Sequence, residues 1–456
     1  MAPTVKNMTE GKPLPLIINF ALPLMLGNIF QQLYTVVDTM VVGKALGVDA
    51  MGDLGATDWM YWLVVGLIAG VTQGFAIPMA REFGARRYDS LRQVVGGSVV
   101  MSAICTVIFF SGAYAATRPV LELLRTPEEI IGSSLLYVRT LLCGMPVVMA
   151  YNLLSCVLRA LGDGKTPLNA MIAAALANIA MDLLFVLVFD WGILGAAVAT
   201  LIAQVVADVF CLAKLWKLDF MRLKKEDFRL SGSMALQLVG MGMPLAFQNA
   251  IIAVGGMIIQ TVVNGFGVTF IAGFTATNKL YGVLEMAASS YGYAMTTYAG
   301  QNLGAGKPGR IRQGMRCAIV VAMVTSLIIG GAMILFGRGI VGLFISGTPE
   351  EITQATGVAY RYLTIMSLCL PVLYILHVAR SAVQGMGDTV LPMVSGIAEF
   401  VMRTGGVLFL PAVLGDTGIF VAEVLAWAGA DLILVPSYYI TIRRVTKKLE
   451  GSYDSQ

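Results

Sequence analysis

Two polar residues, Asn178 and Asp182, interrupt the otherwise apolar run "LANIAMDLLFVLVFDWG" from Leu176 to Gly192. Residues four apart share one face of a helix, so an amide and a carboxyl would lie together among hydrocarbon side chains. Counted at the helical rise of about 1.5 Å per residue, Asp38 and Thr200 fall at similar depths of two other apolar runs. Any one of the four alone could simply bond to a neighbouring helix. Four at matching depth predict a cation site instead.

The chemistry of this site leaves two coupling ions open. Carboxylate, amide and hydroxyl oxygens suit a hard cation such as Na⁺. Two desolvated carboxyls that repel one another, Asp38 and Asp182, could hold H⁺ instead. No other cofactor and no other metal is expected.

Charged residues also fall within apolar runs of the second half of the chain. Glu399 and Arg403 are four apart and are expected to form a structural ion pair rather than to contact substrate. Lys279 and Glu285 could line a cavity, although Lys279 could instead extend toward the membrane surface. The only histidine, His377, is expected to be packed and hydrogen-bonded rather than to relay protons.

The composition is that of an integral membrane protein, since 57% of the 456 residues are hydrophobic and 13% are charged. A soluble domain has about 25% charged residues. Twelve apolar stretches are expected to cross the membrane, each of about 20 residues for a bilayer core about 30 Å thick. Of the 31 lysines and arginines, 23 fall on the side of the N-terminus and four on the other side. Both termini are therefore expected in the cytoplasm of a multi-pass protein of a bacterial-type inner or plasma membrane.

The two halves of the chain repeat one another in the same order. "LPLMLGN" (22–28) resembles "MPLAFQN" (243–249), and "REFGARR" (81–87) resembles "QNLGAGK" (301–307). A longer stretch, "PVVMAYNLLSCVLRALGDGKTPL" (146–168), aligns with "PVLYILHVARSAVQGMGDTVLPM" (371–393). A parallel repeat predicts an all-α membrane protein with two six-helix lobes related by a pseudo-twofold axis along the membrane normal.

This organisation gives five expected segments. They are a cytoplasmic N-terminal leader (1–14), an N-lobe with helices 1–6 (15–216), a cytoplasmic linker (217–233), a C-lobe with helices 7–12 (234–442) and a cytoplasmic tail (443–456).

Several of these motifs together resemble the multidrug and toxic compound extrusion (MATE) family. They are "YTVVDTMVVGKALG" (34–47), the loop pair at 81–87 and 301–307, the repeated "GD…P", and "NIAMD" before "GAAVAT". The resemblance covers about residues 15–444. It implies two lobes that alternate between outward-open and inward-open states and export organic compounds, often cations, against inward Na⁺ or H⁺.

Within this family the chain is most similar to the DNA-damage-inducible-type branch. That branch has a coupling site made of an Asp on the first helix, Asn-x-x-x-Asp on the fifth and Thr on the sixth, matched here by Asp38, Asn178, Asp182 and Thr200. It also has a bending proline and a lobe-facing Gln and Tyr on the first helix, matched by Pro23, Gln31 and Tyr34. Another bacterial branch carries acidic residues on the seventh and tenth helices. The corresponding spans here have none, so a C-lobe site of that kind is not expected.

The sequence thus predicts a secondary active multidrug exporter, a monomer in the lipid bilayer with small-molecule substrates and no nucleic-acid partner. A lipid-linked saccharide flippase of the same broad superfamily is the first alternative, and it would show more basic residues in its cavity. A membrane channel or an enzyme is the second. An enzyme is not expected, because the chain has no histidine cluster, nucleophile elbow or metal-ligand spacing.

Overall fold

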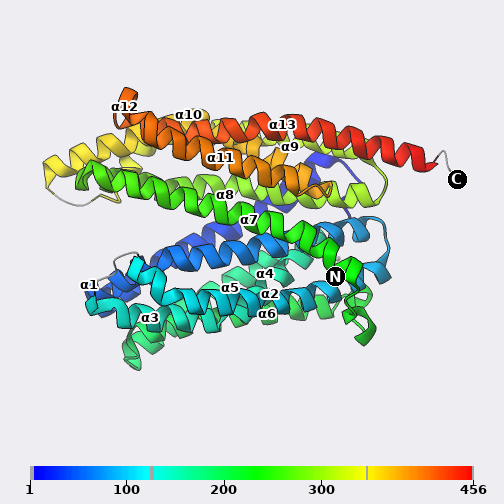
Figure 1. The fold of residues 1–456 in the computed structure, drawn as a ribbon, viewed down its shortest axis with the longest axis horizontal. Coiled ribbons are helices and arrows are strands. Elements are labelled where there is room, and N and C mark those ends of the chain that lie inside the picture. Colours follow the sequence, from blue (N-terminus) through cyan, green and yellow to red (C-terminus); the bar gives the residue numbers. More distant parts are fainter. Residues whose placement is uncertain (1–4, 124–127, 346–347, 454–456) are drawn as a thin grey trace. The chain divides into compact units, whose positions relative to one another are not determined.

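The protein is all-helical over the residues that the computed structural model describes, which are 5–123, 128–345 and 348–453. Side chains are described throughout these ranges except at residues 33–59, 123, 128–130, 187 and 451–453. The helices run alongside one another within each part of the molecule (Figure 1). Their bounds are α1 Pro13–Gly84, α2 Tyr88–Leu123, α3 Glu128–Cys143, α4 Met145–Ala160, α5 Lys165–Asp182, α6 Gly192–Trp216, α7 Gly232–Val263, α8 Val268–Gly304, α9 Pro308–Gly342, α10 Pro349–Gly385, α11 Val390–Phe409, α12 Pro411–Leu414 and α13 Thr417–Tyr453. Short π and 3₁₀ segments occupy Leu183–Val188, Asp219–Met221, Lys225–Phe228 and Asn264–Phe266.

The described residues contain nine helical segments long and apolar enough to cross a membrane, or ten when α3 and α4, bent by 45°, count as one span. Helices α8 and α11, of 37 and 20 residues, are also of spanning length but carry charged side chains. Together these segments correspond to the twelve predicted spans.

The first two predicted spans both lie in α1, a helical element of 72 residues. Its candidate membrane segments are Pro13–Gln32 and Met60–Gly84, which correspond to these two spans.

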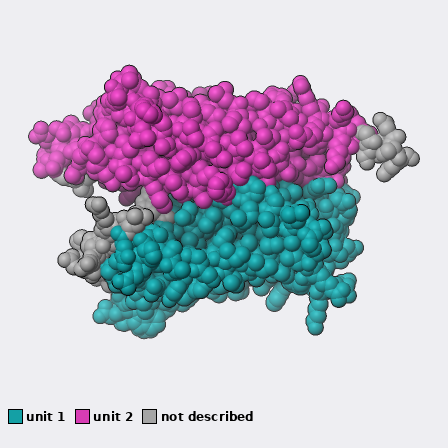
Figure 2. All heavy atoms as spheres, viewed as in Figure 1, with its two compact units in different colours: residues 1–7, 22–246 teal, residues 8–21, 247–456 magenta. Residues whose placement is uncertain are grey.

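The chain separates into two compact units, shown in different colours in Figure 2. Unit 1 comprises Met1–Asn7 and Leu22–Ala246, and unit 2 comprises Met8–Ala21 and Phe247–Gln456. The chain passes from one unit to the other inside α7, and residues 217–233 belong to unit 1.

Unit 1 is packed through small residues as well as large ones. Its buried core includes Ile68, Val71 and Phe75 on α1. A Cβ atom at Gly74 would collide with the backbone of Gly242 on α7, so the two helices touch backbone to backbone there. Close approach at glycine is the usual way in which membrane helices associate, because lipid supplies no hydrophobic drive between them.

Unit 2 has an aromatic core between three helices. The rings of Phe274 on α8 and Tyr362 on α10 are stacked with centroids 5.1 Å apart, and Tyr362 stacks on Phe420 of α13 at 4.5 Å. Tyr362 and Phe420 are almost fully buried. Such stacked pairs contribute about 0.5–1.5 kcal/mol each beyond the burial of their area.

The loop between α8 and α9, the "QNLGAGK" motif, binds the segment that precedes α1. Gln301 Oε1 accepts a hydrogen bond from the backbone N–H of Met8 at 2.8 Å. Asn302 Nδ2 donates to the Met8 carbonyl at 3.2 Å, and Arg310 Nη2 donates to the carbonyls of Met8 and Gly11 at 3.2 and 2.9 Å. Gln301 and Asn302 are fully buried, so within unit 2 this half of the repeated motif anchors the segment that holds Met8 and Gly11.

We expect Asn302→Ala to lower the stability of the protein. The Asn302 amide also donates to the Tyr298 carbonyl at 2.8 Å and accepts from Arg310 Nε at 2.9 Å. Its loss removes three hydrogen bonds from a buried site, at a cost of about 1–3 kcal/mol. Thermal unfolding in detergent would measure the change. Asn264→Ala is the control, because Asn264 is exposed and bonds only locally to Gln260; equal melting temperatures for the two variants would contradict the anchoring role.

Candidate functional site

Helix α5 positions the polar pair of unit 1. Its start is fixed by Asp163, whose Oδ1 accepts hydrogen bonds from the backbone N–H groups of Lys165 and Thr166 at 3.0 and 2.9 Å. Thr166 Oγ1 donates to Asp163 Oδ2 at 2.6 Å. A carboxylate that satisfies free N–H groups at a helix start stabilises it.

Asn178 and Asp182 are both fully buried, at 0% exposure. Neither Nδ2 nor Oδ1 of Asn178 has a hydrogen-bond partner within the described part of the chain. A buried amide without a partner costs about 1–3 kcal/mol, and native proteins retain few such groups without a functional reason. The face predicted from the four-residue spacing is therefore an enclosed polar site inside unit 1.

The helix changes its hydrogen-bonding pattern directly after Asp182. Residues Leu183–Val188 form a π-helical turn, and the Phe189 N–H bonds to the Leu184 carbonyl at 2.9 Å. π-Helical turns are rare in proteins as a whole, and those that occur often lie at functional sites. This feature adjoins the buried carboxyl.

Thr200 is contributed by α6, which packs against α5. A Cβ atom at Gly195 would lie 3.1 Å from Phe185, so the two helices approach closely near this site. The Thr200 hydroxyl donates to the Ala196 carbonyl at 3.1 Å, which leaves its oxygen lone pairs able to ligate a cation.

The other predicted N-lobe residues all belong to α1. Pro23 is buried inside that helix and Gln31 is exposed. The side chains of Tyr34 and Asp38 lie outside the described residues. The described part thus brings Asn178, Asp182 and Thr200 to two adjacent helices.

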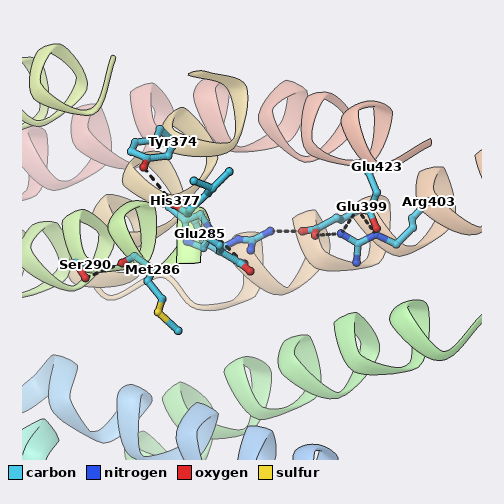
Figure 3. Close-up of polar contacts among 10 residues, drawn as sticks. Glu285, Met286, Ser290, Tyr374, His377, Glu399, Arg403 and Glu423 are labelled. Carbon is cyan, nitrogen blue, oxygen red and sulfur yellow. Dashed lines mark hydrogen bonds and ion pairs between the residues drawn. The ribbon is translucent and has the colours of Figure 1, made fainter. Parts of the chain in front are cut away.

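Unit 2 contains a chain of buried ion pairs, which Figure 3 shows between α10, α11 and α13. Arg403 Nη2 lies 3.0 Å from Glu399 Oε1, the pair expected from their four-residue spacing. The second carboxylate oxygen of Glu399 accepts from Arg380 Nη2 at 2.7 Å. Arg403 Nε donates to Glu423 Oε2 at 3.1 Å. Side-chain exposures of 6–12% show that all four charges are buried, and they compensate one another.

Gln248 on α7 completes this network at one end. With its amide oxygen turned toward Arg380, it accepts from Arg380 Nε and Nη1 at 2.9 and 3.2 Å. Gln248 is 3% exposed, so its amide satisfies guanidinium hydrogens that water cannot reach.

The remaining predicted C-lobe residues are divided. His377 Nε2 lies 3.5 Å from Glu285 Oε1, and this pair is also drawn in Figure 3. Lys279 is exposed on α8. Glu399 and Arg403 are therefore paired directly, and Glu285 lies beside His377. The Lys279 side chain is exposed and does not belong to either pair.

Two charged members of the network, Arg380 and Glu423, are not among the site residues predicted from the sequence. Arg380 is one of the 23 basic residues counted on the side of the N-terminus, whereas it is 8% exposed within α10. Glu423 lies on a different helix from Arg403, twenty residues further along the chain. The one available signal was that both are charged residues in or beside apolar runs, where an ionisable group needs a partner.

An all-helical membrane protein with an internal parallel repeat and buried polar clusters has the architecture of a secondary transporter. A sequence model of the MatE family matches residues 23–184 and again residues 244–405, and the chain belongs to this family of transporters. The two matches coincide with the two halves of the repeat. The prediction of the family and the prediction that the chain is not an enzyme are confirmed.

Two bacterial relatives match nearly the whole chain. It is 28% identical to the probable multidrug resistance protein YpnP of Bacillus subtilis (strain 168), over 91% of this chain and 92% of the relative. It is 23% identical to the multidrug export protein MepA of Staphylococcus saprophyticus, over 95% of each chain.

Solved structures share the fold. A multidrug resistance MATE family transporter of the MOP superfamily, in an outward-facing conformation, superposes with a TM-score of 0.88 over 99% of both chains at 21% identity. A MOP superfamily transporter from Pyrococcus furiosus gives the same TM-score, coverage and identity. These matches confirm the predicted fold class, a multi-pass all-α membrane protein of the MATE type.

Proposed function

We propose that this protein is a secondary active multidrug exporter, which moves organic and often cationic compounds out of the cell in exchange for inward Na⁺ or H⁺. The observation that carries the proposal is the polar face of α5, where Asp182 has a buried carboxyl and Asn178 a buried amide that has no hydrogen-bond partner among the described residues. The names of the relatives, a multidrug resistance protein and a multidrug export protein, support a drug-like substrate.

The coupling ion would bind to oxygens from Asn178, Asp182, Thr200 and Asp38. An ion that binds one conformation more tightly shifts the equilibrium toward it by that difference in affinity, and so drives release of the drug. Pro23, which removes one backbone hydrogen bond inside α1, would allow that helix to bend when the ion binds. Gln31 and Tyr34, on the same helix, would contact substrate. With these roles, we propose that the protein belongs to the DNA-damage-inducible-type branch.

The same proposal includes a topology. The basic residues of the leader (1–14), the linker (217–233) and the tail (443–456) favour a cytoplasmic location for these segments and for both termini. The N-lobe (15–216) and C-lobe (234–442) would act together as a monomer.

Export from proteoliposomes tests the function. Proteoliposomes that contain the protein are loaded with a fluorescent organic cation. A Na⁺ gradient and a pH gradient are then imposed in separate experiments. We expect efflux to accelerate under one of the two gradients, which names the coupling ion. Ion flux without movement of any solute would indicate a channel. Absence of export under both gradients, with movement of a lipid-linked saccharide, would indicate a flippase.

A further inference from the structure

The repeat aligns the polar site of unit 1 with the ion-pair network of unit 2. Helix α5 begins at Lys165 and α11 begins at Val390, 225 residues later. The same offset relates Asp163 to Asp388 and Pro167 to Pro392, on either side of these helix starts. At this offset Asn178 corresponds to Arg403.

Helices α6 and α13 align just as closely, at an offset of 223. Identical residues recur at this spacing in four pairs, Gly195 and Gly418, Ala199 and Ala422, Ala203 and Ala426, and Asp208 and Asp431. Thr200 then corresponds to Glu423. The positions that carry an amide and a hydroxyl in unit 1 carry a guanidinium and a carboxylate in unit 2.

The acidic residue of α11, Glu399, lies two helical turns before the position that corresponds to Asp182 of α5. Asp182, one turn after Asn178, corresponds to Val407, which is buried and apolar. Glu399, one turn before Arg403 on the same face, corresponds to Ala174. Unit 2 therefore keeps carboxylates around this position but supplies them from other residues, and it places a permanent cation between them.

We infer that the guanidinium of Arg403 is a built-in cation, which occupies in unit 2 the position that corresponds to the coupling-ion site of unit 1. The inference rests on the proposed function only for the identity of the unit 1 site. Arg403 is bound by Glu399 at 3.0 Å and by Glu423 at 3.1 Å, and it is 6% exposed. To bind at this position, Na⁺ or H⁺ would have to displace the guanidinium group of Arg403, which is covalently part of the chain.

The consequence is that this position of unit 2 takes no coupling ion. The two carboxylates beside Arg403 are already neutralised, since Glu399 has Arg380 and Arg403 while Glu423 has Arg403. Within the described residues, Glu423 has no ion pair with any other cation. Removal of Arg403 would leave Glu423 as a buried carboxylate without a partner, which is costly unless it takes up a proton or a metal cation.

This difference is measurable as ion-dependent stability. In purified full-length protein, Asp182→Asn removes the unit 1 site, and thermal unfolding is then followed with Na⁺ or choline and over a range of pH. We expect Arg403→Gln in this background to gain a rise in Tm of a few degrees on addition of Na⁺ or on acidification, because a ligand that binds only the folded state stabilises it. Glu423→Gln added to the pair should remove that gain.

Arg403→Lys is the conservative control. It keeps a cation at the position and should show no more ion dependence than the Asp182→Asn parent. A folded Arg403→Gln variant that responds to Na⁺ and pH no differently from its parent would overturn the inference, and so would Na⁺ stabilisation of the lysine variant.

Glu423→Gln in the otherwise unchanged protein gives an independent answer should Arg403→Gln fail to fold. We expect this variant to bind the coupling ion with unchanged stoichiometry, measured by calorimetry or by uptake of labelled Na⁺. Loss of ion binding would overturn the inference, because Glu423 would then be an ion ligand. Failure of the proposed function is distinguishable, since it would appear as ion binding that survives Asp182→Asn.

Discussion

Asp182→Asn is expected to abolish gradient-driven export while leaving folded protein in the membrane. The substitution keeps the size of the side chain but removes the charge that attracts the coupling ion into a site with 0% exposure. Because about 1.4 kcal/mol of lost affinity is a factor of ten, loss of a buried charge contact should reduce export by about tenfold or more. Efflux of a fluorescent cation from proteoliposomes under the effective gradient measures this loss.

Asp190→Asn is the matched control for this variant. Asp190 follows α5 by eight residues and is exposed, and its φ of 55° is one that asparagine also tolerates. The same chemical change should leave export unaltered there. If Asp182→Asn exports as well as Asp190→Asn, the coupling site does not lie at Asp182.

Local spacing was sufficient to predict which residues share a helix face. Asn178 and Asp182, and likewise Glu399 and Arg403, are four apart, and each pair lies on one face because helical geometry leaves no other choice. The repeat and the apolar periodicity similarly predicted twelve spans in two halves. These are properties of short stretches, for which neighbours along the chain decide the outcome.

Features that depend on distant residues were not predictable in this way. The pairing of Arg403 with Glu423 requires the packing of α11 on α13, and the binding of Met8 by Gln301 joins residues 293 apart. The sequence shows the "QNLGAGK" motif as half of a repeat. Its hydrogen bonds to Met8 cannot be predicted from that motif, because Met8 is distant in the chain. The π-helical turn after Asp182 was also missed, since its sequence, Leu-Leu-Phe-Val-Leu-Val, is that of any apolar helix.

The largest loss of stability is expected from Glu399→Gln. Glu399 accepts from Arg380 at 2.7 Å and pairs with Arg403 at 3.0 Å, and its side chain is 6% exposed. The amide has the same shape but no charge, so Arg380 would have no ion pair among the described residues and Arg403 would keep only Glu423. Removing one partner from a buried ion pair costs about 3–5 kcal/mol, which a full-length unfolding curve in detergent should resolve.

Glu122→Gln is the control that separates the effect of burial from the effect of losing an ion pair. Glu122 forms the same four-residue pair with an arginine, Arg118, at 2.8 Å, but both side chains are more than half exposed. A solvated pair of this kind contributes about 0–1 kcal/mol, so this variant should unfold close to the unmodified protein. Equal effects at Glu122 and Glu399 would mean that the unit 2 charges are solvated when the protein is in its membrane. In that case Arg403 could exchange its partners with ions, and the fixed-cation assignment would lose its physical basis.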